Sequence, residues 1–416
     1  MKMDLSKQAS LNTIGSIALL FGQWLISVLL VRIDGFEAAG IFSLAMSISN
    51  VFSAISNYGI RTFQITDVSG RFSQKSYLTA RVVTSLLAFL LCLAYRLVAG
   101  SYSALEYGAI VLYLLYSITN YISDVMLGTL QLQGKLQYNG YSNILRSVCC
   151  FAGFMGAFFA SHNLLIALGV MVVGTVLVTA FYDYPRFRQY KAVGFTAETK
   201  IAKDVKLILQ RCFPLMASLL LPLATTAWPR NVIQAQLGNE ALGYFSSVFT
   251  PTVLLITLIP CIVLAVTPAI AKAWQEKNTG QFLKFNSICY GATFGLCALA
   301  LLAAFFVGKP VMGLIFGEEI LPYYNLLYWA ILAMGASALS TCMNSVLAAM
   351  EKNTAVMVAA GMAFLTVICL SGIFVSRWGL IGAAYGLLAA YLVQAGILCI
   401  SIVLFYQKAN HTKKGL

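Results

Sequence analysis

The sequence predicts an all-α integral membrane protein with about twelve transmembrane helices, arranged as two homologous six-helix bundles. Three observations predict this fold class: the composition, the length of the apolar runs and an internal repeat. Of the 416 residues, 60% are hydrophobic and only 10% are charged, whereas soluble domains carry about 25% charged residues. The apolar runs are continuous and reach the roughly 20 residues that a helix needs to cross a bilayer. Because transmembrane β-strands alternate in polarity, these continuous runs argue against a β-barrel.

The internal repeat is the stretch GFEAAGIFS at residues 35–43, which returns as GNEALGYFS at residues 238–246. The two copies share Gly, Glu, Ala, Gly, Phe and Ser at matching positions, and each lies between two long apolar runs. A second, weaker match pairs Met126, Leu130 and Lys135 with Met343, Leu347 and Lys352. Many transporters contain repeats of this kind, so we expect two homologous halves.

Each half is predicted to hold six spans. The expected spans are residues 12–32, 38–60, 77–99, 105–127, 140–161, 163–183, 212–236, 242–268, 285–308, 323–348, 354–376 and 379–406. The predicted domains are an N-terminal bundle (1–183), a cytoplasmic connector (184–211) and a C-terminal bundle (212–416). The first residues lead into a full-length span without a cleavage pattern, so we expect no cleavable signal peptide.

The distribution of lysine and arginine predicts the orientation. With both termini in the cytoplasm, 22 of the 27 lysines and arginines lie on the cytoplasmic side. This bias accounts for the formal net charge of +13 without nucleic acid, because such residues lie beside anionic lipid. Both copies of the repeat then lie on the outer face. We therefore expect parallel halves, related by a pseudo-two-fold axis along the membrane normal, with a central cavity between them.

The connector has a periodic pattern of its own. Ile201, Val205, Ile208, Leu209 and Cys212 recur at helical spacing, with basic residues between them. This pattern predicts an amphipathic helix that lies in the membrane plane and leads into span seven.

Charged residues in the spans are the first candidates for function, because an ionisable group in lipid is costly unless it faces a cavity or a partner. These candidates are Arg32, Arg61, Asp124, Arg146 and Arg230. Arg32 and Arg230 lie near the outer end of the first span of each half, against the charge bias. Guanidinium groups stay charged and bind phosphate bidentately, so a cavity lined by arginines from both halves suits a pyrophosphate.

Some of these charged residues have simpler interpretations. Arg61, Arg81 and Arg146 can equally reach the inner headgroups by snorkelling. Asp124 and Arg146 lie near the cytoplasmic ends of neighbouring spans, where they could pair with each other. Apart from Asp124, we expect no acidic residue deep in a span.

Uncharged polar residues in the spans add a lining that suits sugars. They are Gln23, Asn50, Asn57, Asn120 and Gln234. Each is equally suited to hydrogen bonds between helices. Six of the nine prolines lie in spans seven and eight, so we expect span seven to bend and the second half to carry more of any movement.

Stretches in both halves match one known family in order and spacing. They are RIDGFEAAGIFS (32–43), YGIR (58–61), TD (66–67), LQLQGK (130–135), PR (229–230), LGNEALGYFS (237–246), IFGE (315–318) and GLIGAAYG (379–386). Together they resemble the polysaccharide-repeat-unit flippases of the multidrug/oligosaccharidyl-lipid/polysaccharide exporter superfamily. The matches extend over nearly the whole chain.

The resemblance implies two six-helix bundles around a cationic cavity, to which Arg32 and Arg230 correspond. It implies alternating-access transport of an undecaprenyl-pyrophosphate-linked oligosaccharide from the inner to the outer leaflet of the bacterial plasma membrane. The implied partners are the lipid-linked oligosaccharide and membrane lipids, with a polysaccharide polymerase as a further candidate and no nucleic acid. No cofactor is implied, and the resemblance leaves open whether protons or sodium ions drive transport.

Three alternatives remain. A multidrug or small-solute cation-coupled exporter of the same superfamily would share the fold. A facilitator-type transporter also has twelve spans in two halves, and DVSGR (67–71) weakly resembles its loop motif, but two basic residues of that motif are missing. A glycan-polymerising membrane enzyme would need a large outer loop with catalytic groups. The outer loops here are short, and His162 and His411 lie far apart in sequence, so we predict no enzyme, no catalytic residue and no metal site.

Overall fold

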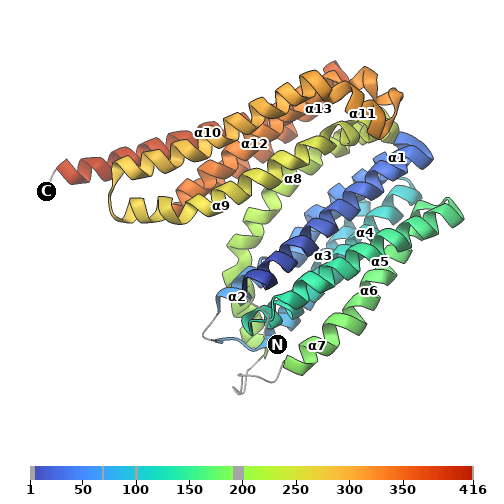
Figure 1. Ribbon diagram of the computed structural model, residues 1–416, viewed down its shortest axis with the longest axis horizontal. Coiled ribbons are helices and arrows are strands. Elements are labelled where there is room, and N and C mark those ends of the chain that lie inside the picture. Colours follow the sequence, from blue (N-terminus) through green and yellow to red (C-terminus); the bar gives the residue numbers. More distant parts are fainter. Residues whose placement is uncertain (1–4, 68–69, 99–101, 191–200, 415–416) are drawn as a thin grey trace. The chain divides into compact units, whose positions relative to one another are not determined.

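The computed structural model describes residues 5–67, 70–98, 102–190 and 201–414, and within these ranges every regular element is a helix (Figure 1). The elements of the first part of the chain are α1 (Leu5–Asn57), α2 (Ile60–Thr66), α3 (Gln74–Val98), α4 (Ala104–Leu132), α5 (Gln137–Ser161), α6 (Leu164–Val178), η1 (Thr179–Asp183) and α7 (Tyr184–Tyr190). The remaining elements are α8 (Ile201–Phe249), η2 (Thr250–Thr252), α9 (Val253–Gln275), α10 (Thr279–Ala303), η3 (Ala304–Gly308), α11 (Lys309–Phe316), η4 (Glu318–Tyr323), α12 (Asn325–Ala349) and α13 (Asn353–Lys414).

Nine helical segments in the described ranges are long and apolar enough to cross a membrane. Three of the helices, α1, α8 and α13, each join two helices across a glycine with non-helical backbone angles. These glycines are Gly35, Gly238 and Gly379, and each lies where two predicted spans meet. The all-α multi-span prediction is therefore confirmed, while the count of twelve stays a prediction.

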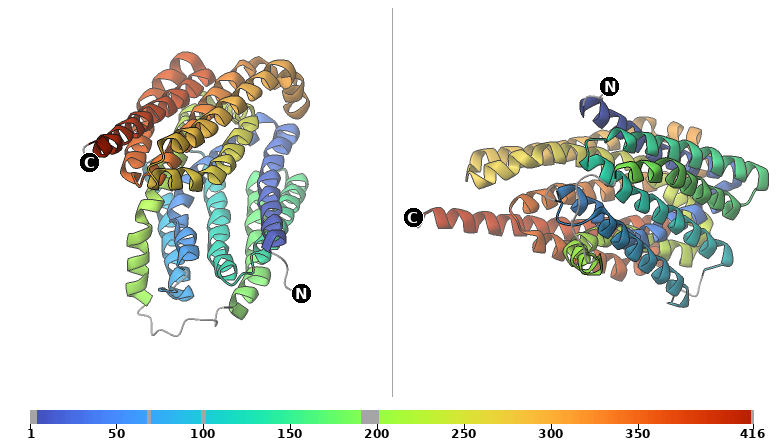
Figure 2. Two further views of the ribbon diagram at one scale, coloured as in Figure 1. Left: turned by 60° about the vertical axis from the view of Figure 1, so that its left-hand side comes forward. Right: turned by 90° about the horizontal axis from the view of Figure 1, so that it is seen from below.

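The chain divides into two compact units, Met1–Leu223 and Ala224–Leu416. In the first unit, α1 packs against α3, α4 and α5, and α4 also packs against α6. In the second unit, α12 packs against α9, α10 and α13, and Figure 2 shows these yellow-to-red helices running alongside one another. The symmetry axis and the three-part domain division remain predictions.

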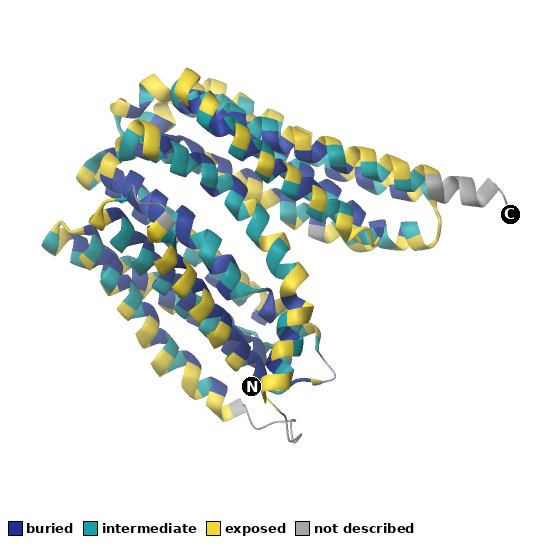
Figure 3. Ribbon diagram, turned by 180° about the vertical axis from the view of Figure 1, so that it is seen from behind, coloured by how far each residue is buried: buried dark blue, intermediate teal, exposed yellow. Residues whose placement is uncertain are grey.

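Large apolar side chains cover the outside of both units. Figure 3 shows exposed residues along the outer faces of the helices in each bundle. Leu90, Phe181, Phe294 and Phe305 are among these exposed side chains. An apolar outer surface of this kind is stable only against lipid, which agrees with a multi-pass membrane protein.

The first unit extends into α8 because the start of that helix packs on the N-terminal bundle. Val205, Ile208 and Cys212 are buried in one cluster with residues of α2, α3 and α4. The Ser76 hydroxyl also donates to a carboxylate oxygen of Asp204, at 3.0 Å. Residues from Ile201 are helical as the start of α8, and protein covers Val205, Ile208 and Cys212, so the in-plane amphipathic helix of the connector stays a prediction.

The two copies of the repeat have the same local backbone. Gly35 has φ 83° and ψ −174°, and Gly238 has φ 87° and ψ 179°. This region of backbone space is open essentially only to glycine, which explains why both copies keep it. The aromatic positions also agree, because Phe42 and Phe245 are both fully buried.

The weaker repeat is a pair of equivalent helix ends. At the end of α4, the Lys135 amide donates to the Leu130 carbonyl at 2.9 Å, and at the end of α12 the Lys352 amide donates to the Leu347 carbonyl at 2.8 Å. The preceding residues, Gly134 and Glu351, both have positive φ. Together these features form a Schellman-type helix end at matching positions in each half.

Three of the six clustered prolines lie in α8 and do not interrupt it, while the others lie in η2 and α9. Pro214, Pro222 and Pro229 all lie within α8, whose non-helical backbone is at Gly238. The boundary between the compact units falls one residue after Pro222. Whether span seven bends during transport stays a prediction.

Candidate functional site

The N-terminal unit contains a cavity of about 470 Å³ between α1, α4 and α5. Helix α4 supplies its longest wall, because Tyr113, Tyr116, Asn120, Asp124 and Leu127 recur every three or four residues and so lie on one face. At the helical rise per residue, this face extends over about 21 Å. The volume is in the usual range for small-molecule pockets, about 300–1,000 Å³.

The cavity brings together half of the predicted site residues. Its lining includes Gln23 and Asn50 from α1, Asn120 and Asp124 from α4, and Arg146 from α5. These five positions span more than 120 residues of sequence, so helix packing rather than local sequence assembles them. No residue of the second unit belongs to this lining.

Arg146 is the centre of a buried polar network. Its side chain is only 3% exposed, and its Nη2 lies 2.5 Å from Oδ2 of Asp183, whose side chain is fully buried. Its Nε donates to the Ser142 hydroxyl, its Nη1 to the Asn120 amide oxygen, and its Nη2 also to the Thr179 hydroxyl. The arginine is therefore held by α4, α5 and the η1 segment at once, which fixes its guanidinium beside the cavity.

Asp183, the acidic partner of Arg146, lies on an irregular helical turn. Residues Thr179–Asp183 form a single π-helical turn, η1, between α6 and α7. The turn places the Thr179 hydroxyl and the Asp183 carboxylate on Arg146, while Ser123 of α4 donates to the same Asp183 oxygen at 2.6 Å. Turns of this kind often occur at functional sites, where they re-aim side chains.

A second ion pair joins Arg61 to Asp124 of the cavity lining. Arg61 of α2 donates through Nη1 to the Asp124 carboxylate and, at 3.0 Å, to the Asp124 carbonyl. Its Nη2 donates to the Gln131 amide oxygen at 2.7 Å. Asp124 is also part of the cavity lining, so Arg61 reaches the site through this carboxylate.

These contacts correct the pairing expected from the sequence. Asp124 and Arg146 do not pair with each other, since Asp124 bonds Arg61 and Arg146 bonds Asp183. The sequence did not single out Asp183, which is completely buried and is the acidic partner of Arg146. One sequence signal could have revealed it: Thr175, Thr179 and Asp183 recur every four residues and form a polar stripe on an otherwise apolar span.

Arg81 and Arg146 are buried inside the bundle instead of snorkelling to headgroups. Arg81 donates to the Ser56 carbonyl at 2.5 Å and to the Asn57 carbonyl, the last carbonyls of α1. A cation is favourable there because a helix C-terminus carries partial negative charge. The guanidinium also lies 5.6 Å from the ring centre of Tyr121, which lines the cavity.

The other predicted residues lie elsewhere. Arg32 is exposed on α1, and the Asn57 side chain is absent from the described cavity lining. Arg230 and Gln234 are on α8 in the second unit. Arg230 donates to the Thr226 carbonyl at 2.7 Å and lies 5.9 Å from the ring centre of Phe245. Whether these four residues contact substrate remains a prediction.

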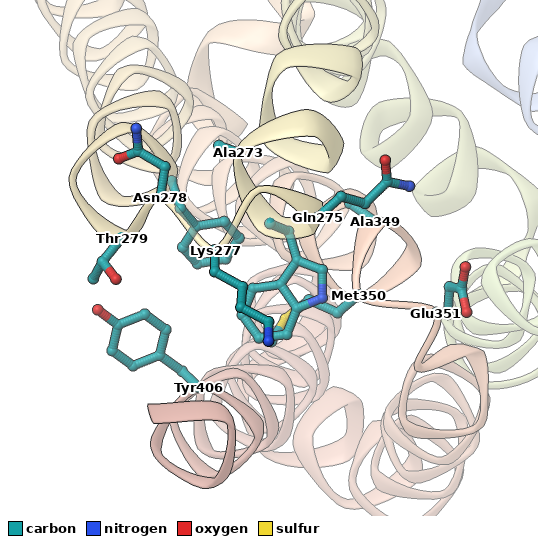
Figure 4. Close-up of a pocket in the computed structure, with 11 residues that line it drawn as sticks. Ala273, Gln275, Lys277, Asn278, Thr279, Ala349, Met350, Glu351 and Tyr406 are labelled. Atoms are coloured by element: carbon teal, nitrogen blue, oxygen red, sulfur yellow. The ribbon is translucent and has the colours of Figure 1, made fainter. Parts of the chain in front are cut away.

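The second unit has a cavity of about 350 Å³ at the ends of α9, α10, α12 and α13. Figure 4 shows Lys277, Glu351 and Tyr406 around it. Its lining contains one lysine and one glutamate and no arginine, so it offers no net charge for a phosphate. The cavity of the N-terminal unit is therefore the stronger candidate site.

The described residues contain no group of three or more His, Cys, Asp or Glu side chains that could hold a metal ion. The cavity offers guanidinium, carboxylate, amide and phenol groups, which suit the binding of a polar ligand.

The fold is that of a multi-span transporter. An inward-facing multidrug resistance MATE family transporter of the MOP superfamily is similar in structure, with a TM-score of 0.71 and 17% identity, over 97% of this chain and 99% of that chain. The lipid II flippase MurJ, in an inward closed conformation, also has a TM-score of 0.71, with 16% identity, over 94% of this chain and 87% of that chain.

The chain belongs to the polysaccharide biosynthesis protein family, whose sequence model matches residues 5–274. A relative in Staphylococcus aureus, the capsular polysaccharide biosynthesis protein CapF, is 23% identical over 299 residues, which cover 71% of this chain and 74% of CapF. These findings confirm the resemblance that the motifs predict. The protein is therefore a multi-pass membrane protein of the polysaccharide biosynthesis family, with the fold of a multi-span transporter.

Proposed function

We propose that this protein is a flippase that moves an undecaprenyl-pyrophosphate-linked oligosaccharide from the inner to the outer leaflet of the bacterial plasma membrane. The observation that carries the proposal is the cavity of the N-terminal bundle, which joins buried arginine to uncharged polar groups in a member of a polysaccharide biosynthesis family. The fold shared with the lipid II flippase MurJ supports the same class of cargo.

The charges of the site favour an anion. Arg61, Arg81 and Arg146 lie in or beside the cavity, against Asp124 and Asp183, so the described site has an excess of one positive charge. Taking a phosphate out of water is costly unless it is paired, and guanidinium groups pair with phosphate bidentately. The substrate's phosphate would compete with Asp183 for the Arg146 guanidinium.

Transport follows from the different solubilities of head and tail. The polyprenyl tail stays in the bilayer, while the charged sugar head occupies the hydrated cavity and is exposed to each side in turn. Arg32 and Arg230 are proposed to extend the cationic path in the two halves. Protons or sodium ions are proposed to drive the cycle, with Asp124 and Asp183 as the acidic groups in the site that they could neutralise.

The proposal includes the orientation and the partners of the protein. Both termini lie in the cytoplasm, and a polysaccharide polymerase receives the flipped repeat unit. A multidrug or small-solute exporter is the second candidate function, because the multidrug transporter of the same superfamily shares the fold.

The test is export of the repeat unit in a strain whose own flippase is deleted. The double variant Arg146→Gln/Asp183→Asn removes both charges and keeps the hydrogen-bonding shape, so it should insert normally and export at least about tenfold less polysaccharide. Arg32→Ala and Arg230→Ala should show the same loss. The matched control is Arg96→Gln, since Arg96 is exposed and lies over the Tyr107 ring, away from the cavity.

Export and membrane abundance are measured together, by surface polysaccharide and by immunoblot. Normal export by the arginine variants at normal abundance would show that the cationic-cavity proposal is wrong. Export of dyes in place of glycan would favour the multidrug exporter.

A further inference from the structure

Most of the residues that line the cavity of the N-terminal unit are uncharged. Apart from Asp124 and Arg146, its lining consists of tyrosines, amides, serines and leucines. Arg146 takes the Asn120 oxygen, and Gln23 donates to the Tyr116 hydroxyl at 3.2 Å. These contacts leave two lining amides, Asn50 and Asn143, to be explained.

Asn50 of α1 and Asn143 of α5 are half-buried, and within the described ranges their side-chain amides make no hydrogen bond. Each amide therefore presents N–H donors and a C=O acceptor to the cavity. The two amides are therefore available to hydrogen-bond a polar ligand that enters the cavity.

The neighbouring groups restrict the chemistry of that ligand. Tyr113 and Tyr121 add aromatic side chains to the lining, and Leu19, Leu20 and Leu127 add apolar contact. An acetamido substituent combines one N–H, one C=O and one methyl group. An asparagine side chain can satisfy the N–H and the C=O, and a leucine can cover the methyl group.

A hydroxyl in the same place would fit less well. It could pair with only part of each amide, and it would leave the apolar wall without a contact. Because an unpaired buried donor or acceptor is costly, the difference should be visible as affinity.

We propose that this cavity binds an N-acetylated amino sugar, with Asn50 and Asn143 recognising its acetamido group. The inference rests on the proposed flippase function and names the sugar class that the site prefers. It makes these two asparagines specificity determinants, separate from the arginines that attract the phosphate.

The experiment compares three synthetic probes on the full-length protein in nanodiscs. The probes are farnesyl pyrophosphate, farnesyl-pyrophosphoryl-N-acetylglucosamine and farnesyl-pyrophosphoryl-glucose, with affinities measured by isothermal titration calorimetry. The N-acetylglucosamine probe should bind about tenfold or more tightly than the glucose probe. Asn50→Ala and Asn143→Ala should each reduce that preference, while binding of farnesyl pyrophosphate stays unchanged.

Asn12→Ala is the matched control, because Asn12 is an asparagine of α1 outside the cavity lining. It should preserve both affinity and preference. Equal binding of the two sugar probes, or a preference that survives both asparagine variants, would overturn the inference and leave the flippase proposal standing. Failure of all three pyrophosphates to bind would instead contradict the proposed function itself.

Discussion

Arg146 can remain charged inside the bundle because four neighbouring side chains form an ion pair or hydrogen bonds with its guanidinium. Asp183 neutralises it, and Ser142, Asn120 and Thr179 accept the remaining donors. A buried ion pair of this kind contributes little net stability over an apolar pair, but removing one partner leaves an uncompensated charge. The pair is therefore better explained by a role in the site than by stability.

The contrast between an intact buried ion pair and a single unpaired charge gives a prediction for single and double variants. Arg146→Gln alone and Asp183→Asn alone should each destabilise the protein by about 3–5 kcal/mol, because each leaves one buried charge unpaired. The double variant should be more stable than either single variant. Thermal unfolding in detergent measures all three, and simple additivity of the two single effects would contradict the assigned pair.

Asn120 has two roles in the structure, because it bonds Arg146 and also lines the cavity. The sequence makes it a sugar-compatible amide or a contact between helices, and both interpretations apply in part. Its oxygen accepts from Arg146, while its nitrogen donates to the Tyr116 carbonyl of its own helix at 3.1 Å. Asn120 is thus a positioning residue for Arg146, although it also lines the cavity.

At the scale of the elements, the repeated glycines determine where long helices change direction. Gly35 and Gly238 both have positive φ with ψ near 180°, and neither would bring an added Cβ within 4 Å of another group. The requirement at these positions is therefore the backbone conformation itself and not the available space.

Gly35→Ala and Gly238→Ala should accordingly each cost about 1–3 kcal/mol. The control is Gly156→Ala in α5, where an added Cβ also meets nothing within 4 Å but φ is not positive. That change should be neutral or slightly stabilising, since alanine favours a helix over glycine by about 0.5–1 kcal/mol. Melting temperatures of the purified variants test this, and equal effects at all three positions would contradict it.

Helix α8 shows how one element belongs to two units. Its first turns complete the core cluster of the N-terminal bundle through Val205, Ile208 and Cys212. The rest of the helix, from Ala224, belongs to the second unit. Pro222 and Pro229 lie on either side of that boundary, and each removes a backbone hydrogen bond from the helix there.

At the scale of the whole molecule, the matching backbone of both repeats supports a chain built from two related halves. The kink at Gly35 corresponds to that at Gly238, and the Schellman-type end of α4 corresponds to that of α12. If the halves are parallel, Glu37 and Glu240, both exposed, lie on the same side of the membrane.

Cysteine labelling tests this orientation. The exposed native cysteines, Cys149, Cys261, Cys369 and Cys399, are first replaced by serine. An impermeant maleimide should then label both Glu37→Cys and Glu240→Cys in intact cells, because the charge distribution places both on the outer face. Lys203→Cys, at an exposed position on α8, should react only after permeabilisation. Labelling of the two glutamate positions from opposite sides would exclude parallel halves.

The sequence by itself determined the features that depend on local chemistry. Apolar composition required membrane-spanning helices, the repeated glycines marked the kinks in α1 and α8, and the polar face of α4 supplied Asn120 and Asp124. These features could be predicted because each depends on residue type, helical period or backbone freedom within one segment.

Tertiary structure alone decided which charges meet. Helix packing pairs Arg146 with Asp183 and Asp124 with Arg61. It also places Asn50 and Asn143 in the lining of one cavity, and it leaves Arg32 exposed. Sequence spacing could not supply these pairings, because they depend on which helices are neighbours and on the π-helical turn that re-aims Asp183. In lipid, a charge is stabilised by the partner within reach, and only the packed bundle defines that partner.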